Sequence, residues 1–197
     1  MARFVGRENV RKRLGPLEGE PGCTTYADGA VRIEAAGEVL TVRPPFGLPH
    51  AGEYEVVRLE PLFEALAADH VVAALLVRLG GYAVGVFEGE RLVASKVGTR
   101  FVKGRHKKGG SSSSRFRRRR EEQARVLLDA AAETFERVVE PYSVEFVALG
   151  GDRRAVDQVL ERIDLPAPSL PRFFTTGDPR QRDLERLPYD LYAAEIS

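Results

Sequence analysis

Residues 71–96, VVAALLVRLGGYAVGVFEGERLVASK, contain the pattern that decides the fold. Their first part, Val71–Leu79, is an almost continuous apolar run rich in valine and leucine, which is typical of a buried strand. The pair Gly80-Gly81 predicts a turn. Two further strands, Tyr82–Phe87 and Arg91–Lys96, are predicted to form a hairpin across a short Glu-Gly-Glu turn. The stretch therefore predicts a three-stranded meander.

A long helix, a strand and a second helix are predicted downstream of the meander. From Ala124 onwards, apolar residues recur every three or four positions, as in an amphipathic helix that ends at Pro141. Val144–Leu149 predicts a strand, and Asp152 is a good N-cap for the following helix. The apolar stripes of the two helices are Leu127, Leu128, Ala131, Phe135, Val138 and Val139, and then Val156, Val159, Leu160 and Ile163. The order predicts the α/β class, with a mixed sheet and packed helices.

The segments on either side have weaker patterns. In the N-terminal part, Val31–Glu34 and Val39–Arg43 predict strands around an Ala-Ala-Gly turn, and Pro61–Asp69 predicts a short helix. The proline-rich C-terminal tail is expected to pack on the domain as a short strand and a helix. The predicted organisation is a strand-rich extension over 1–60, a domain over 61–165 that carries a basic loop at 100–120, and a tail over 166–197.

Positive charge is concentrated in that loop. The formal net charge of the chain is +1, yet Arg100–Arg120 contains ten basic residues and no acid, so the rest has 20 basic and 29 acidic residues. Such a segment fits a polyanion. RNA fits better than DNA, because we find no helix-turn-helix pattern. The predicted RNA-binding residues are Arg100, Lys103, Arg105, Lys107, Lys108, Arg115, Arg117, Arg118, Arg119 and Arg120.

The centre of the loop is thin and uncharged. Gly109-Gly110 and Ser111–Ser114 carry no bulky side chain, and a loop from Gly104 to Ser114 could project roughly 15–20 Å. Arg117–Arg120 come before the acidic residues of the long helix. Positive charge at the start of a helix opposes the helix macrodipole and costs about 0.3–1 kcal/mol per residue. Phosphates at the helix start would compensate for this cost. The pattern predicts a loop that inserts into a nucleic acid; a flexible surface loop with incidental charge is the alternative.

Several functional classes are not supported by the sequence. It contains no HExxH, paired CxxC, GxSxG, Walker A or GxGxxG motif, and its three histidines are far apart, so we expect no metal site and no cofactor. Cys23 is the only cysteine, which excludes an internal disulfide and favours the cytoplasm. The longest uninterrupted apolar run, Val71–Val77, is far shorter than the roughly 20 residues of a membrane span, and no secretory signal is expected.

The order of these features resembles a known family. A hairpin leads into a basic loop with Gly109-Gly110, then Arg115-Phe116 and a long helix, and later the strand and turn Val144–Gly151. Over residues 71–163 this order resembles the middle, catalytic domain of eukaryotic and archaeal class-1 peptide-chain release factors. It is still more similar to the related Vms-like release factor (VLRF) family, which has bacterial members. In these proteins the loop carries Gly-Gly-Gln, and Arg-Phe follows it.

The resemblance implies an RNase H-like core and a loop that enters the peptidyl-transferase centre. There the family hydrolyses the ester bond of peptidyl-tRNA, so the implied partners are the rRNA of the large ribosomal subunit and peptidyl-tRNA. In VLRF relatives this reaction rescues stalled ribosomes and does not depend on a stop codon. The catalytic residues implied by the resemblance are Gly109, Gly110, Ser111, Ser112 and Ser113.

One departure from the family pattern concerns the glutamine that helps to position the attacking water. Ser111 takes its place in strict alignment, and Ser112 or Ser113 in the VLRF pattern. A serine hydroxyl or the backbone N–H could still orient a water molecule. Two alternatives therefore stay open: a ribosome-binding protein that does not hydrolyse peptidyl-tRNA, and an α/β domain whose basic loop is disordered and whose partner is a protein.

Overall fold

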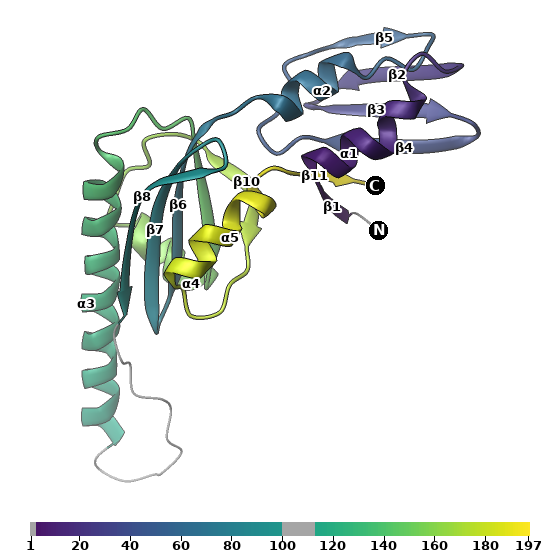
Figure 1. Cartoon of the computed structure of the whole chain (residues 1–197). Helices are drawn as coiled ribbons and strands as arrows, with labels where there is room; N and C mark the ends of the chain where they lie inside the picture. Colours follow the sequence, from purple (N-terminus) through teal and green to yellow (C-terminus); the bar gives the residue numbers. More distant parts are fainter. Residues whose placement is uncertain (1–2, 100–112) are drawn as a thin grey trace. The chain divides into compact units, whose positions relative to one another are not determined.

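The computed structural model describes residues 3–99 and 113–197. The chain forms two compact units (Figure 1). The first unit comprises Met1–Asp69 and Leu187–Ser197, and the second unit comprises His70–Arg186. These boundaries differ from the three segments expected from the sequence, because the helix expected at Pro61–Asp69 belongs to the first unit and the tail is divided between both units.

The second unit contains a five-stranded mixed sheet in the order β10-β9-β6-β7-β8. Neighbours β6, β7 and β8 pair antiparallel, which confirms the meander, whereas β9 pairs parallel with both β6 and β10. The mixed α/β sheet expected from the sequence is therefore confirmed. The strand bounds are Val71–Arg78 for β6, Gly81–Glu88 for β7, Arg91–Thr99 for β8, Phe146–Gly151 for β9 and Ser169–Phe174 for β10.

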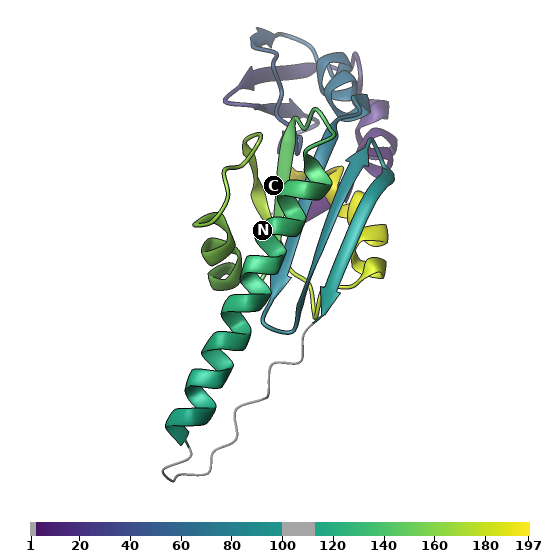
Figure 2. The same ribbon diagram turned by 90° about the vertical axis from the view of Figure 1, so that its left-hand side faces the viewer.

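Helices cover both faces of this sheet (Figures 1 and 2). On one face, the long helix α3 packs against β7 and β8, and α4 lies beside it. On the other face, α5 approaches β7, where Leu184 lies 3.2 Å from the position of a Cβ built on Gly85. Helix bounds are Ser113–Val139 for α3, Arg153–Leu160 for α4 and Gln181–Leu191 for α5.

Burial on both faces explains the apolar run in β6. Ala73, Leu75 and Val77 belong to the core that also contains the apolar stripes of α3 and α4, and the intervening residues of the strand are buried as well. A strand covered on both sides needs no polar alternation. The predicted N-cap is confirmed, since the backbone N–H of Ala155 donates to Asp152 Oδ1 at 3.0 Å.

The first unit contains a six-stranded antiparallel sheet in the order β1-β11-β4-β3-β2-β5. The predicted strands at Val31–Glu34 and Val39–Arg43 correspond to β3 and β4, and the predicted short helix corresponds to α2. The bounds are Arg3–Gly6 (β1), Arg7–Leu14 (α1), Gly15–Leu17 (a 3₁₀ turn), Gly22–Ala27 (β2), Ala30–Ala35 (β3), Glu38–Arg43 (β4), Gly52–Tyr54 (β5), Glu60–Ala67 (α2) and Ala193–Ile196 (β11).

The end of the chain completes the sheet of the first unit. Strand β11 lies between β1 and β4. The tail thus forms the expected strand and helix, β10 and α5, and in addition the strand β11, which was not expected. The core beneath this sheet includes Tyr26, whose hydroxyl donates to the carbonyl oxygen of Arg58 at 2.5 Å. Burial raises the pKa of Tyr26 to about 12.

Candidate functional site

The predicted site lies between β8 and α3. Gly109, Gly110, Ser111 and Ser112, together with Arg100, Lys103, Arg105, Lys107 and Lys108, lie outside the described residues. Ser113, Arg115 and Arg117–Arg120 lie in the first turns of α3. The structure therefore places the arginines that follow the loop on a helix, and it defines the strand end and the helix start from which the loop departs.

A buried tyrosine on β7, the neighbour of the strand that leads into the loop, is hydrogen-bonded to the helix that follows the loop. The hydroxyl groups of Tyr82 on β7 and Thr134 on α3 form a buried hydrogen bond of 2.9 Å. Across the sheet, Gly98 on β8 pairs with Tyr82, and a Cβ at Gly98 would lie 2.3 Å from the tyrosine ring. The missing side chain at Gly98 therefore leaves room for the ring that connects the sheet to α3.

Replacing Tyr82 by phenylalanine should lower the free energy of unfolding by about 1 kcal/mol, because the buried hydroxyl of Thr134 loses its partner. Chemical denaturation followed by circular dichroism measures this change. Tyr142→Phe is a matched control, since it removes a hydroxyl from a partly buried tyrosine at the end of α3. An equal loss of stability in both variants would contradict the role given to the Tyr82 hydroxyl.

The arginine-rich half of α3 projects beyond the sheet (Figures 1 and 2). Among the described side chains of α3, full burial begins at Leu127, whereas the helix begins at Ser113, roughly 20 Å earlier along its axis. Arg118 and Arg119 are exposed and Arg120 is partly buried. The first turn contains no acidic residue. This end of the helix thus presents positive charge together with the positive end of the macrodipole.

Acidic residues further along α3 neutralise other arginines. Arg125 donates to Glu122 at 2.8 Å, and this hydrogen bond raises the pKa of Arg125 above its usual value. No described carboxylate forms an ion pair with Arg118 or Arg119. Arg118 and Arg119, near the start of α3, therefore carry positive charge without a described ion-pair partner.

Sequence patterns alone did not predict the supporting roles of Tyr82, Gly98 and Thr134. A signal was present, because Tyr82 is the only polar side chain between Gly81 and Phe87. Thr134 lies three residues after Ala131, on the apolar stripe of the helix. A polar atom at two core positions indicates a buried hydrogen bond, but the sequence does not say that these two residues are partners.

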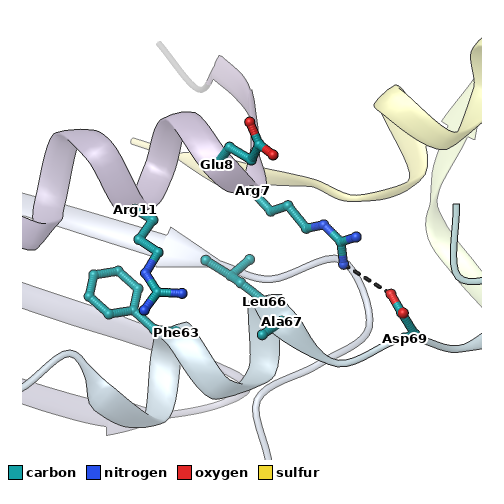
Figure 3. A pocket seen from close by; sticks show the side chains of 7 residues that line it. All are labelled: Arg7, Glu8, Arg11, Phe63, Leu66, Ala67 and Asp69. Carbon is teal, nitrogen blue, oxygen red and sulfur yellow. Dashed lines mark hydrogen bonds and ion pairs between the residues drawn. The ribbon is translucent and has the colours of Figure 1, made fainter.

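A pocket lies in the first unit, between α1 and α2 (Figure 3). This pocket of about 220 Å³ is lined by Arg7, Glu8, Arg11, Phe63, Leu66, Ala67 and Asp69. Arg7 donates to Asp69 at 3.1 Å, and the guanidinium carbon of Arg11 lies 5.7 Å from the centre of the Phe63 ring. Arg7, Arg11 and Asp69 are thus engaged with protein partners, and none of the predicted site residues lines this pocket.

Within residues 3–99 and 113–197, no cluster of three or more histidine, cysteine, aspartate or glutamate side chains could hold a metal ion. Over the same described ranges, no helix has the length and apolar character needed to cross a membrane.

Comparisons with known proteins relate the chain to release factors. Residues 70–197 match the family described as Actinobacteria/chloroflexi VLRF1 release factor, acVLRF1. The match begins where the second unit begins. No curated protein matches the chain.

Among solved structures, the chain is similar to an archaeal translation termination factor, aRF1, with 15% sequence identity and a TM-score of 0.46. The similarity covers 95% of this chain and 55% of the archaeal chain, so the chain spans about half the length of that relative. The family match covers well over half of the chain, and it agrees with the resemblance drawn from the loop and the elements around it. The chain therefore belongs to the VLRF1 release factor family of Actinobacteria and Chloroflexi.

Proposed function

We propose that this protein is a cytoplasmic ribosome rescue factor that hydrolyses peptidyl-tRNA on stalled large subunits. The observation that carries the proposal is the Gly109-Gly110 loop followed by Arg115-Phe116, placed between β8 and the arginine-rich start of α3 in a release factor family. The loop would enter the peptidyl-transferase centre, and the second unit would be the catalytic unit. Its mixed sheet with helices on both faces supports an RNase H-like core.

The reaction requires an oriented water molecule. Water attacks the ester carbonyl carbon, the bond to the 3′ oxygen of the terminal tRNA ribose breaks, and that oxygen takes up a proton while the peptide leaves as a carboxylic acid. Gly109 and Gly110 would let the backbone approach closely, and Ser111–Ser113 would hold the water through a hydroxyl or a backbone N–H. Positioning of this kind can contribute a large part of the rate without a strongly basic side chain. We propose no cofactor.

The basic residues would bind rRNA and tRNA phosphates. Their contribution is testable separately from catalysis, because phosphate contacts make binding depend on salt. The proposed set is Arg100, Lys103, Arg105, Lys107, Lys108, Arg115, Arg117, Arg118, Arg119 and Arg120.

Replacement of Arg117–Arg120 by glutamine should weaken binding to ribosomes and make it less sensitive to salt. Each lost phosphate contact lowers the slope of log K against log salt by about 0.7–0.9, so the change should be about 2–4 for the four residues. Co-sedimentation at several salt concentrations measures this slope. A control with Arg91, Arg137, Arg162 and Arg186 replaced by glutamine changes the charge equally at exposed positions. Unchanged co-sedimentation of the Arg117–Arg120 variant would favour a protein partner instead of RNA.

The proposed activity is tested by incubating the protein with stalled ribosome complexes that carry labelled peptidyl-tRNA. Released peptide above the buffer level supports hydrolysis. A variant with Ser111–Ser113 replaced by alanine distinguishes the two ways of holding the water. It should lose activity if a serine hydroxyl holds the water, and keep activity if a backbone N–H does.

The missing glutamine favours a second candidate function. With serine at position 111, the loop could occupy the peptidyl-transferase centre without hydrolysing the ester. This candidate predicts salt-sensitive binding to stalled complexes and no peptide release, so co-sedimentation and the release assay on the same sample distinguish the two functions.

A further inference from the structure

A second group of arginines lies at one edge of the sheet in the second unit. Strands β6, β9 and β10 are parallel, so their carboxyl ends lie at the same edge. Strand β8 runs in the same direction, because two antiparallel pairings separate it from β6. Its last residue, Thr99, marks the start of the loop at this edge. Arg78 ends β6, and Arg153 and Arg154 begin α4 directly after β9.

Arg78 and Arg153 are close together and are held by the same segment. The backbone N–H of Asp152, the residue before Arg153, donates to the carbonyl oxygen of Val77, the residue before Arg78, at 2.7 Å. Arg78 donates to the carbonyl oxygen of Thr176 at 2.9 Å. The guanidinium carbon of Arg153 lies 4.3 Å from the centre of the Phe173 ring. The chain at and after the end of β10 therefore supports both side chains.

No described acidic residue forms an ion pair with the arginines at this edge. Arg78, Arg153 and Arg154 are exposed, and none of them forms an ion pair within the described ranges. Three acids lie nearby: Asp152 accepts the capping hydrogen bond of α4, Asp157 lies one turn along α4, and Asp178 lies beside the turn that follows β6. Two arginines in the first turn of a helix also oppose its macrodipole. An anion at this edge would relieve both kinds of repulsion.

The contact with Phe173 also prepares Arg153 for an anion. A guanidinium that lies over an aromatic ring uses its face for this contact, and its N–H groups lie along its edge. Those N–H groups match the oxygens of a phosphate in a bidentate geometry. The contact thus restricts the side chain without occupying all of its hydrogen-bond donors.

We propose that Arg78, Arg153 and Arg154 form a second RNA-binding surface, which contacts backbone phosphates beside the loop. The inference rests on the proposed function, because it assumes that the loop is inserted into RNA. The surface lies two to three strand spacings from the end of β8, or roughly 10–15 Å. An RNA that surrounds the loop would reach this edge, and two phosphate-binding regions would fix the orientation of the second unit.

The test compares a triple variant, Arg78→Gln/Arg153→Gln/Arg154→Gln, with a control, Arg91→Gln/Arg137→Gln/Arg162→Gln. The control removes the same charge from exposed positions at the opposite ends of β8, α3 and α4. Binding to large ribosomal subunits that carry peptidyl-tRNA is measured by co-sedimentation at several salt concentrations. The slope of log K against log salt should fall by about 2–3 in the triple variant and stay within experimental error in the control.

A lysine version, Arg78→Lys/Arg153→Lys/Arg154→Lys, should retain most of the slope, because it keeps the charge while losing the contact with Phe173. A triple variant with the slope of the wild type, or a control that loses as much, would overturn the proposal. So would a lysine version that loses as much as the glutamine version, since packing would then explain the effect. Peptide release, measured on the same complexes at saturating protein, reports on the proposed function independently: a slope change without any release supports this surface and contradicts hydrolysis.

Discussion

Replacing Gly151 by alanine is expected to lower the free energy of unfolding of the second unit by about 3–5 kcal/mol. Gly151 ends β9 with a φ of 104°, a conformation that L side chains rarely adopt. A Cβ at this position would lie 2.1 Å from the carbonyl oxygen of Val77 on the neighbouring strand. That oxygen belongs to the backbone of a central strand, so it cannot move away without disrupting the parallel pairing.

Calorimetry or thermal denaturation should show the transition of the second unit at a temperature about 10–20 °C lower. Gly177→Ala is the matched control within the same unit, because no described atom lies within 4 Å of a Cβ at that position. The control should stay within about 0.5 kcal/mol of the wild type. If Gly151→Ala unfolds at the same temperature as the control, the close approach of β9 and β6 is not as described.

Replacing Gly110 by alanine should reduce peptide release by about 100-fold or more while ribosome binding stays within about twofold. In the proposed mechanism this glycine lets the backbone approach the ester, and a displacement of the water by about 1 Å costs a factor of that size. The charged residues on both sides of the loop are unchanged, so phosphate contacts and affinity should be retained. Single-turnover release and co-sedimentation measure the two effects.

Ser114→Ala is the control for this experiment, since Ser114 lies in the same serine run but outside the proposed catalytic set. It should release peptide within about twofold of the wild-type rate. Release by Gly110→Ala at the wild-type rate would show that the loop glycine does not position the reaction. A parallel loss of binding and release would assign Gly110 to recognition instead of catalysis.

Much of the second unit could be predicted because its elements carry strong local patterns. Val71–Val77 is apolar throughout since both faces of β6 are covered, and Asp152 has the chemistry of an N-cap. The start of α3 was predicted from its charges and not from its apolar pattern, and the structure places Arg117–Arg120 in its first turns as expected. An apolar stripe marks only the buried part of a helix, from Leu127 onwards, whereas the helix itself begins at Ser113.

The first unit shows why the last strand of the tail could not be predicted. Its last strand, Ala193–Ile196, has four residues and pairs with Arg3–Gly6 at the other end of the chain. Such a short strand has almost no periodicity, and a pairing between the two ends of the sequence leaves no local signal. The division of the tail between two units follows from this distant pairing.

Only part of the candidate site could be predicted from the sequence, for the same reason. Composition and charge identified the loop and the arginines that follow it, because these properties are local. The bond between Tyr82 and Thr134 and the contact of Arg153 with Phe173 join residues that are far apart in sequence, so they could be found only after the sheet and helices were placed.

The most direct test of the account is a single-turnover release assay with the wild-type protein on stalled large subunits carrying labelled peptidyl-tRNA. Co-sedimentation of the same sample establishes that the complex has formed. We expect the peptide to be released well above the buffer level in that bound sample. Stable, salt-sensitive binding with release no greater than in buffer would contradict hydrolysis and leave the ribosome-binding function in its place.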